Sequence, residues 1–333
     1  MSEETYSRTL LIDSSGVLHR CFHGYPAVSN QWEGQNINVN ALFGYMKYTQ
    51  RLMNEFACER MIHVLDPDGG SDYRYGLYPE YKAHRDPTHP ELKVQKDLLP
   101  KMLAAMGQSY IQVPGVESDD VLGILAKKAN AQNHLVMIVS QDKDLLQIVE
   151  DGKVGLVRYV QRNDGADGKL HQYYDEGEVL KSLGVLPNQV ADYLALIGDS
   201  VDNIPGVKDC GPKTAATWLQ TYGNLATLMM HAQEVKGRGA KGLVEALDKL
   251  PLYQQLTTVL QDIEGVDFPE DRPHLAEDCD RFCSLLRAPY EWRTIFGPKG
   301  YVYEQQSAPA PRSHEPVMVE QPPAKPEWKR PSF

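Results

Sequence analysis

Four short apolar runs and three longer segments of helical periodicity alternate along the first 140 residues. Short apolar runs predict strands, and apolar residues spaced three and four apart predict helices. The strands are expected at 8–13, 60–66, 109–113 and 135–140, and the helices at 39–56, 91–107 and 118–131. Because strands that alternate with helices are typical of parallel sheets with helical crossovers, the pattern predicts an α/β fold, a mostly parallel central sheet flanked by helices.

The remainder of the chain departs from this alternation. Residues 67–90 are irregular, aromatic and basic, which predicts a mobile surface element beside Asp66. After the α/β part the pattern becomes mainly helical, and the last thirty residues are rich in Pro and Glu/Gln, which is typical of disorder. We therefore expect an α/β core at 8–186, a helical region at 187–300 and a disordered tail at 304–333.

Composition places the chain among ordinary globular proteins. Its 333 residues are 42% hydrophobic and 24% charged, enough for one large domain or two modest ones. The polar N-terminus lacks the layout of a signal peptide, and no apolar run is long enough to cross a bilayer. We expect a cytoplasmic protein without membrane contact.

Five cysteines are scattered along the sequence, which argues against a disulfide framework. Cys279 and Cys283 lie four apart near His274, but a structural zinc site normally needs four ligands in close pairs, and a second pair is missing. Reduced, half-buried thiols are the better interpretation.

The net charge is −11, the wrong sign for a protein that binds nucleic acid. This objection weakens if many of the acids are concentrated in one site and neutralised by bound cations. The positions of the acids therefore matter more than their total.

Acidic residues follow three of the predicted strands. Asp13 and Asp66 end the first two strands, and Asp142 and Asp144 come soon after the strand at 135–140. Because sites in parallel sheets form at the carboxyl ends of the strands, these acids are expected to lie together. On an extended segment Asp142 and Asp144 would point the same way, whereas a solvated loop is the simpler interpretation of that pair.

A second group of acids, Glu117, Asp119 and Asp120, stands at the start of the predicted helix 118–131. Ser118 is a plausible N-cap, and acids in a first helical turn complement the helix dipole. That structural role would explain this group if it stood alone.

A third group consists of Asp199 and Asp202, which are three residues apart. On one helical turn the two side chains would share a face. The alternative is a polar turn that ends a helix.

These nine acids would repel one another in a single cleft unless cations neutralised them. Oxygen ligands suit Mg²⁺ or Mn²⁺, and two such ions about 4 Å apart would activate a water and stabilise an in-line phosphodiester displacement. The candidate metal ligands are Asp13, Asp66, Glu117, Asp119, Asp120, Asp142, Asp144, Asp199 and Asp202. No Ser–His–Asp or Cys–His arrangement competes for the chemistry.

A Gly-rich turn within 204–222 opens into a predicted helix. Gly206 and Gly211 belong to the turn, and Lys213 and Thr214 stand with backbone N–H groups at the helix start, where phosphate binds well. A simple helix hairpin capped by Gly is the alternative. The spacing does not match a Walker loop.

Six blocks occur in an order that is familiar from one family. They are Leu11-Ile-Asp13, Tyr81-Lys82 with Arg85, Val113-Pro-Gly-Val-Glu-Ser-Asp-Asp120, Ser140-Gln-Asp-Lys-Asp-Leu145, Ile197-Gly-Asp-Ser-Val-Asp-Asn-Ile-Pro-Gly-Val207 and Gly211-Pro-Lys-Thr-Ala215. From about residue 9 to 265 the chain resembles the 5′ nuclease family: the 5′–3′ exonuclease domain of bacterial DNA polymerase I, stand-alone bacteriophage 5′ exonucleases and, more distantly, flap endonucleases.

The resemblance implies a PIN-like core with two metal positions. The ligands of the metal nearer the attacking water would be Asp13, Asp66, Glu117 and Asp119. Those of the second metal would be Asp120, Asp142, Asp144, Asp199 and Asp202. Mg²⁺ or Mn²⁺ is the expected cation.

The resemblance also implies how DNA is held. Residues 67–90 match a helical arch over the 5′ single strand, in which Lys82 and Arg85 contact the scissile phosphate and Arg74 and Tyr81 also bind DNA. The 204–222 segment matches a helix–three-turn–helix element that grips duplex backbone and in relatives can bind K⁺. The turn departs from the family in two places, Asp209 for the usual first glycine and Pro212 after the next glycine, and an acid facing phosphate would weaken duplex binding.

We therefore predict a structure-specific nuclease with 5′–3′ exonuclease and 5′ flap endonuclease activity that removes primers in replication and repair. Its substrates would be DNA with 5′ ends, flaps or nicks, or RNA primers in hybrid duplexes. The alternatives are a catalytically weak paralogue that binds branched DNA and an RNA-cleaving relative. We expect a monomer in a bacterial or phage-infected cell, with the Pro-rich tail as a contact for replication proteins.

Overall fold

The computed structural model describes residues 7–56, 58, 60–160, 171–271 and 275–287. A six-stranded sheet runs through the molecule in the order β5-β4-β1-β6-β7-β8. Its strands are β1 (Arg8–Asp13), β4 (Arg60–Leu65), β5 (Ser109–Gln112), β6 (Leu135–Val139), β7 (Val154–Tyr159) and β8 (His171–Tyr174). The first five strands in that order are parallel, and β8 pairs antiparallel with β7. The predicted α/β fold is confirmed.

The strand order reverses at β1. The chain runs outward from β1 through β4 to β5, returns beside β1 as β6, and continues in the opposite direction to β7. Such a reversal opens a crevice outside the carboxyl ends of neighbouring strands, where α/β proteins bind ligands. Asp13 is the last residue of β1 and therefore stands at the reversal point.

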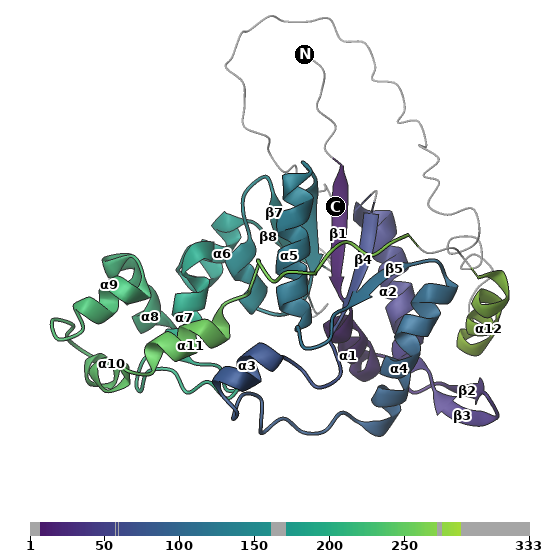
Figure 1. Cartoon of the computed structure of the whole chain (residues 1–333), viewed down its shortest axis with the longest axis horizontal. Coiled ribbons are helices and arrows are strands. Elements are labelled where there is room, and N and C mark those ends of the chain that lie inside the picture. The colour runs from purple at the N-terminus through teal and green to yellow at the C-terminus, as the bar shows by residue number, and fades with distance from the viewer. Residues whose placement is uncertain (1–6, 57, 59, 161–170, 272–274, 288–333) are drawn as a thin grey trace, which may run out of the picture.

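Alternate residues of the strands face two opposite layers of helices (Figure 1). On β1, Leu10 and Ile12 belong to one buried cluster and Leu11 to the other, as the period of two in a strand requires. The first layer holds α1 (Ser14–Gly24), α2 (Asn40–Phe56), α4 (Pro90–Ala105) and α12 (Ala276–Leu286), and the second layer holds α5 (Ser118–Ala131).

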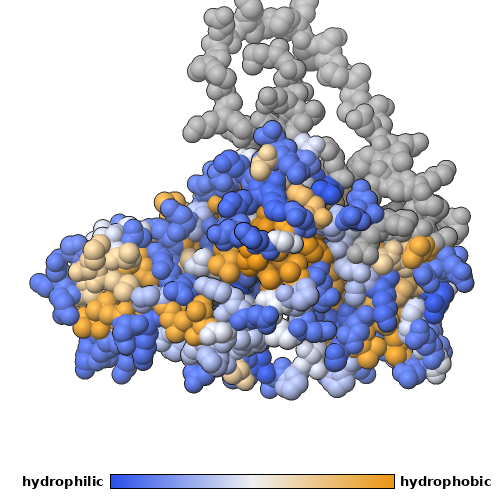
Figure 2. Space-filling model, viewed as in Figure 1, coloured by the Kyte–Doolittle hydropathy of each residue, from blue (hydrophilic) through white to orange (hydrophobic). Residues whose placement is uncertain are grey.

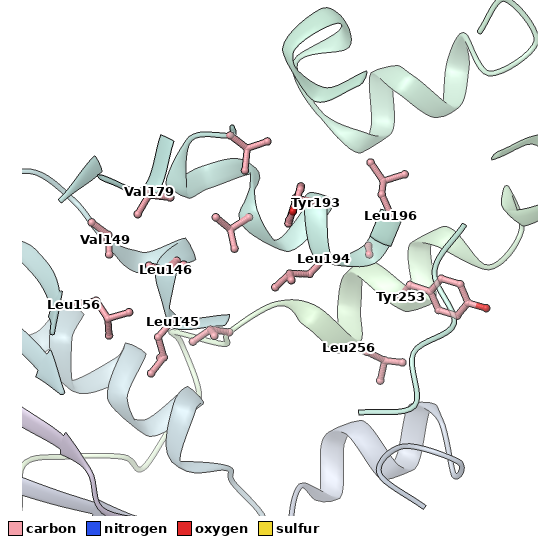
Figure 3. Close-up of a cluster of buried hydrophobic side chains, with 14 of the residues drawn as sticks. Leu145, Leu146, Val149, Leu156, Val179, Tyr193, Leu194, Leu196, Tyr253 and Leu256 are labelled. Atoms are coloured by element: carbon pink, nitrogen blue, oxygen red, sulfur yellow. The ribbon is translucent and has the colours of Figure 1, made fainter. Parts of the chain in front are cut away.

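Shorter helices extend the second layer beyond the sheet. They are η1 (Asp144–Ile148), α6 (Glu176–Leu183), η3 (Pro187–Gln189), α7 (Val190–Ile197), α8 (Pro212–Tyr222), α9 (Leu225–Met230), α10 (Ala240–Ala246) and α11 (Leu250–Thr257). Figure 1 shows α8 to α11 at one side of the sheet, and Figure 3 shows Leu145 and Leu146 of η1 beside Leu194 of α7. One continuous buried cluster joins these helices to the sheet. The loop after α7 is therefore held at a defined place relative to β1.

The strands and helices predicted for the first 140 residues are all present, with ends that differ by at most two residues. The pattern did not predict α1 or the antiparallel hairpin of β2 (Ser29–Trp32) and β3 (Gln35–Asn38). Polar residues outnumber apolar ones in all three elements, so their hydrophobic signal is weak.

Within 67–90 the short helix α3 (Asp72–Leu77) precedes a run of turns, in line with the predicted irregularity. The prediction of a mobile surface element is wrong for two side chains. Arg74 and Tyr81 are buried, with exposed fractions of 3% and 2%. This segment is therefore anchored in the protein interior at two points.

The stretch 258–271 crosses the outside of α5 on its way from α11 toward α12 (Figure 1). The Leu260 N–H donates to Asp120 Oδ1 at 2.9 Å, and Lys128 of α5 forms an ion pair with Asp267. This crossing covers α5 and brings the end of α11 close to the start of α5.

All five cysteines are buried, fully rather than half as expected, and no disulfide joins them in the described part of the chain. Burial raises the pKa of the Cys21 and Cys58 thiols to about 11. His274, the third residue of the weak zinc pattern, and the tail 304–333 lie outside the described residues.

Figure 2 shows that hydrophilic residues dominate the outline of this face of the molecule. Hydrophobic residues gather near α5 and over the region of α8 to α11. In the part of the chain that the structure describes, no helix is both long enough and apolar enough to cross a membrane.

Candidate active site

The end of β1 places Asp13 at the centre of the crevice. Its Oδ1 accepts a hydrogen bond from the Gly16 N–H at 2.9 Å, and its Oδ2 accepts one from the Ser140 hydroxyl at 2.7 Å. A side chain at position 16 would begin 2.3 Å from Asp13 Oδ2, so glycine is required for this close approach. Asp13 is thus fixed both by the start of α1 and by the residue that follows β6.

Asp66 follows β4 and is held by the start of α5. Its Oδ1 accepts hydrogen bonds from the N–H of Ser118 at 2.9 Å and from the Ser118 hydroxyl at 2.7 Å. The prediction that Ser118 is an N-cap is wrong: Glu117 occupies the cap position without a side-chain hydrogen bond. The Ser118 side chain instead joins Asp66 to α5, and the next residue, Asp119, opens the helix beside it.

Asp142 lies in the loop between β6 and η1, and Asp144 is the first residue of η1. The Asp144 N–H donates to Asp142 Oδ1 at 2.9 Å, and Lys143 between them has helical backbone angles of φ −74° and ψ −22°. The pair is therefore not on an extended segment, and the solvated loop fits the exposed Asp142 but not Asp144, which begins η1. Asp144 Oδ1 is buried and has no hydrogen-bond partner among the described residues.

Asp199 and Asp202 belong to a tight loop after α7, which agrees with the polar turn and excludes a shared helical face. Backbone hydrogen bonds of 2.8 Å run in both directions between Asp199 and Ile204. Asp199 Oδ1 also accepts from the N–H of Val201 at 2.8 Å. The Lys143 ammonium lies 3.0 Å from Asp199 Oδ2, so the loop is tied to the acids after β6.

Burial and the charges of neighbouring acids raise the pKa of three carboxyls, those of Asp13, Asp119 and Asp144. The pKa of Asp13 rises to about 7, first because the group is buried and then because Asp66 and Asp142 lie nearby. The pKa of Asp119 is raised well above its usual value by burial and by four neighbouring acids, Asp142, Asp13, Asp66 and Asp144. Five of the predicted ligands therefore share one electrostatic environment.

Asp144 connects this group to the loop after α7. Burial raises its pKa, and the charges of Asp142, Asp202 and Asp199 raise it further. The seven members of the acid cluster are Asp13, Asp66, Asp119, Asp142, Asp144, Asp199 and Asp202.

The acid cluster suits divalent cations in its chemistry. All its donors are carboxylate oxygens, which Mg²⁺ and Mn²⁺ prefer, and raised pKa values indicate negative charge without enough compensation. The buried and unpaired Asp144 Oδ1 is an oxygen that a cation would satisfy. In the described ranges, no three His, Cys, Asp or Glu side chains form a ready-made ligand set, so the acids are neighbours and not a preassembled cage.

The structure separates two of the nine predicted ligands from the acid cluster. Arg74 binds both oxygens of Asp120, at 2.6 and 2.9 Å, and its Nη1 lies 3.0 Å from Glu117 Oε2. Asp120 is 1% exposed, and both of its oxygens face the guanidinium. Asp120 is therefore a structural partner, and its expected role as a metal ligand is corrected.

Arg74 itself was expected to bind DNA, and the structure places it in the interior instead. Besides the two carboxylates it donates to the backbone carbonyls of Leu256 at 3.0 Å and Thr258 at 2.9 Å. Burial alone would lower the pKa of Arg74, but Asp120 and Glu117 outweigh it and raise the pKa. A guanidinium with this many partners in the protein is not available to bind a nucleic acid.

Lys82 and Arg85 reach the acids from the turns after α3. The Lys82 ammonium lies 2.5 Å from Glu117 Oε1 and 3.7 Å from Asp202 Oδ2, and Arg85 Nη2 lies 2.6 Å from Asp202 Oδ1. The Tyr81 hydroxyl donates to Asp202 Oδ2 at 2.9 Å, so this side chain is directed inward. The expected contact of Tyr81 with DNA does not fit this inward orientation.

A cleft of about 1680 Å³ passes beside the acid cluster. Five members of the acid cluster line it, namely Asp13, Asp142, Asp144, Asp199 and Asp202, with Lys143 and Arg85 among them. The remaining wall comes from α1, α2 and the end of β7, and it carries the cations Arg20, Lys47, Arg51 and Arg158. The cleft is therefore acidic at the strand ends and basic along the helices.

The sequence pattern did not predict this basic wall. The residues of α1 that line the cleft are at positions 16, 19, 20, 21, 23 and 24, and the basic and His residues among them recur three and four apart after Asp13. Basic and His residues at such spacing after a strand that ends in Asp would have been the signal.

The N-terminus of α8 carries the residues expected to grip duplex DNA. Gly211 is its N-cap residue without a side-chain cap, Pro212 is the first helical residue, and Lys213 is exposed. Gly206 has a positive φ of 67°, and a side chain there would begin 2.3 Å from the Gly198 nitrogen. Gly206 is therefore required by backbone packing, which is a structural reason for this glycine that the sequence did not reveal.

Asp209 adopts the left-handed backbone conformation, with φ of 63°. Glycine adopts this conformation without strain, whereas most other residues do so at a cost. The geometry therefore favours glycine at this position, as the resemblance implied, whereas the chain has Asp209, an exposed acid two residues before the cap of α8.

Comparison with known families covers most of the chain. Residues 8–184 match the model of the 5′–3′ exonuclease N-terminal resolvase-like domain, and residues 185–277 match that of the 5′–3′ exonuclease C-terminal SAM fold. The junction between the two models falls after α6.

Three relatives illustrate the similarity. DNA polymerase I of Thermus aquaticus is 31% identical over 309 residues, covering 89% of this chain and 34% of the polymerase. DNA polymerase I of Mycobacterium tuberculosis is 30% identical over 282 residues, covering 82% of this chain and 30% of the polymerase. The 5′–3′ exonuclease of Aquifex aeolicus is 29% identical over 266 residues, covering 80% of this chain and 87% of the relative. The chain thus spans about a third of the length of the polymerases it matches.

Solved structures share the fold at low identity. The T5 5′-exonuclease with bound zinc ions has a TM-score of 0.60 at 19% identity, covering 84% of this chain and 100% of that one. The catalytic core of Rad2 in complex with DNA substrate has a TM-score of 0.52 at 15% identity, covering 87% of this chain and 92% of that one. The chain belongs to the 5′–3′ exonuclease family, with its N-terminal resolvase-like domain and its C-terminal SAM fold both present.

Proposed function

We propose that this protein is a structure-specific 5′ nuclease that hydrolyses DNA phosphodiester bonds at 5′ ends and 5′ flaps. The observation that carries the proposal is the acid cluster, whose seven carboxylates gather at the strand-order reversal and five of which line an open cleft. Strand ends and one loop bring these acids together at the cost of mutual repulsion, which a purely structural role would not require.

Two groups within the acid cluster would hold the cations. Asp13, Asp66 and Asp119 would hold one cation and Asp199 and Asp202 a second, with Asp142 and Asp144, whose charges act on members of both groups, shared between them. Mg²⁺ or Mn²⁺ in these positions would supply Lewis acidity for water activation and for stabilisation of phosphate oxygens. Glu117 stands at the edge of the first group, where Lys82 and Arg74 already neutralise it.

Lys82 and Arg85 are the proposed catalytic residues of the chain itself. Both cations border the acid cluster and would donate hydrogen bonds to the scissile phosphate as negative charge develops there. Asp202 holds both cations in place, at 3.7 Å from Lys82 and 2.6 Å from Arg85. Asp202 would thus position the Lys82 and Arg85 side chains and also serve as a ligand at the second metal position.

Duplex DNA would be gripped at the start of α8. Backbone N–H groups, exposed Lys213 and Thr214 at a helix N-terminus form a suitable phosphate contact, and turn carbonyls there could bind K⁺ as well. Contacts of this kind recognise structure and not base sequence. We propose that the substrates are DNA flaps, nicks and 5′ ends, or RNA primers in hybrid duplexes. The protein would cut them as a monomer during replication and repair. The tail 304–333 would contact replication proteins.

The test is cleavage of a 5′-end-labelled flap duplex with Mg²⁺, beside an EDTA control and an Asp142→Asn variant. Asp142 is exposed, so the fold should tolerate this change. Asp97→Asn is the matched control, because that acid lies on α4, is 54% exposed and does not line the cleft. Short labelled products should appear with the wild type and Asp97→Asn alone. Flap binding without cleavage in both Mg²⁺ and Mn²⁺ would contradict the proposal and leave a DNA-binding protein.

A further inference from the structure

A tight turn with one left-handed residue places Lys82 beside the acid cluster. The Ala83 N–H donates to the Glu80 carbonyl at 3.1 Å, which closes a four-residue turn over 80–83. Lys82 is the third residue of this turn and has a positive φ of 55°. Turns of this kind usually have glycine at that position, because a residue with a side chain adopts a positive φ only at a cost. Such a conformation persists where the surrounding structure enforces it, so the contacts of the turn decide where Lys82 lies.

The loop after α7 contacts this turn through two consecutive residues. The side-chain Nδ2 of Asn203 donates to the Glu80 carbonyl at 2.7 Å, and the Asp202 carbonyl accepts a hydrogen bond from the Lys82 N–H at 3.1 Å. The Glu80 carbonyl therefore accepts two hydrogen bonds, one within the turn and one from a residue 123 positions away. These bonds hold the turn against the loop that carries Asp199 and Asp202.

Asn203 is itself a left-handed residue, with φ of 60°. The loop is closed beside it by the two hydrogen bonds of 2.8 Å between Asp199 and Ile204, so the backbone from which its amide extends is fixed. Asn tolerates this conformation better than most residues, but glycine adopts it without cost. The backbone alone therefore does not explain the side chain at this position, whereas the hydrogen bond to Glu80 does.

The position of the turn matters because Lys82 reaches the acids through a long side chain. Its ammonium lies 2.5 Å from Glu117 Oε1 and 3.7 Å from Asp202 Oδ2. A lysine side chain is flexible, so its terminal charge is placed accurately only if its backbone is fixed. In enzymes, a displacement of about 1 Å in a catalytic group can cost a large factor in rate. Loss of the contact between Asn203 and Glu80 would permit such a displacement.

We propose that Asn203 is a positioning residue for the nuclease reaction. Its side-chain amide holds the turn 80–83 against the loop 199–204 and thereby sets the distance between Lys82 and the proposed second metal position. Asn203 touches neither the substrate nor the cations in this role. The proposal rests on the proposed nuclease function, because Lys82 is a catalytic residue only within it.

Asn203→Gly is the informative variant, because glycine adopts φ of 60° without strain and lacks only the side chain. Asn133→Gly is the matched control, since Asn133 also has φ of 60°, is exposed and does not line the cleft. Hydrogen exchange of the segment 80–85 measures the contact in the absence of DNA and of cleavage. Single-turnover cleavage of a flap duplex, flap binding in Ca²⁺ and calorimetric titration with Mn²⁺ measure its consequences. Thermal melting verifies that each variant is folded.

We expect the Lys82 and Ala83 amides to exchange faster in Asn203→Gly than in the wild type or in Asn133→Gly. The single-turnover rate of Asn203→Gly should fall about tenfold, the effect of one lost hydrogen bond on the placement of Lys82. The dissociation constants for flap DNA and Mn²⁺ should stay within about twofold of the wild-type values, because binding does not require Lys82 to be placed accurately. A merely structural role would instead lower the melting temperature and weaken binding together with the rate.

A double variant tests whether Asn203 acts through Lys82. In a Lys82→Met background, Asn203→Gly should change the single-turnover rate by less than about twofold, because the group that it positions is already gone. An equal loss of rate in both backgrounds would overturn the inference. Unchanged hydrogen exchange of 80–85 in Asn203→Gly would also overturn it, as would an unchanged rate despite faster exchange.

Failure of the proposed nuclease function has a different signature. In that case the wild type itself cuts nothing in Mg²⁺ or Mn²⁺, whatever the variants do. Faster exchange of 80–85 in Asn203→Gly would then leave the contact between Asn203 and Glu80 as a structural bond without a catalytic role.

Discussion

Arg74 grips both carboxylate oxygens of Asp120 in the protein interior, at 2.6 and 2.9 Å. The pair joins α3 to the start of α5, and the further bonds of Arg74 to the carbonyls of Leu256 and Thr258 join both to the end of α11. Three segments that surround the acid cluster thus meet at one guanidinium. The adjacent residue, Asp119, belongs to the acid cluster itself.

Substitutions of Asp120 and Asp142 distinguish an effect on stability from an effect on metal binding. We expect Asp120→Asn to lower the free energy of unfolding by about 3–5 kcal/mol, because it leaves a buried guanidinium without its main counter-charge. Asp142→Asn should change stability little and weaken Mn²⁺ binding. Urea unfolding and calorimetric Mn²⁺ titration of both variants make the comparison, and a stable Asp120→Asn protein that no longer binds Mn²⁺ would restore Asp120 as a ligand.

The raised carboxyl pKa values predict an unusual dependence of stability on pH. Asp13 has a folded pKa of about 7 against an ordinary value of 3.8, and the pKa of Asp119 and Asp144 is also raised. The folded state therefore binds protons more tightly than the unfolded state, so metal-free stability should fall as pH rises from about 4 through about 7. Melting temperatures in EDTA should show this decline, and Mg²⁺ should remove most of it.

A substitution tests the assignment of this pH effect to Asp13. Asp13→Asn keeps the acceptor oxygen for Gly16 or Ser140 but removes the charge. Its metal-free melting temperature should vary less between pH 4 and pH 7 than that of the wild type. An unchanged slope would assign the effect to other groups.

Lys82 is expected to act in cleavage more than in folding. Lys82→Met should lower the single-turnover cleavage rate about 100-fold, because one donor to the developing phosphate charge is lost. Glu117 keeps Arg74 and Tyr81 as partners, which limits the effect on stability. Lys93→Met, on the exposed face of α4, is the control. Equal rates for the two variants would remove Lys82 from the proposed mechanism.

A substitution in the turn before α8 is expected to increase both the stability of the protein and its binding to duplex DNA. Asp209→Gly should raise the free energy of unfolding by about 1 kcal/mol, because glycine adopts φ of 63° without strain. Removal of the negative charge should also tighten binding to duplex DNA. Asp209→Asn is the matched control, since it removes the charge but keeps the side chain. Weaker duplex binding by both variants would show that the acid supports the site, for instance as a ligand of K⁺.

The sequence was sufficient for those features that depend on local pattern. Apolar runs alternating with amphipathic segments predicted the parallel sheet, because burial of one face imposes its period on the chain. Asp13 and Asp66 were expected to meet because each directly ends a strand, and parallel strands present their carboxyl ends at one edge. The α1 helix and the basic wall of the cleft were missed, since polar residues conceal their periodicity.

The roles of neighbouring acids were decided by the tertiary structure. Asp119 and Asp120 are adjacent on α5, and the helical turn between them directs one toward Asp13 and Asp142 and the other toward Arg74. Nothing local distinguishes the two side chains, because Arg74 arrives from a segment 46 residues away. The sequence by itself thus determined that carboxylates would gather at the strand ends. Only the tertiary structure decided which of them keep their charge facing the cleft, because that depends on where distant cations are buried.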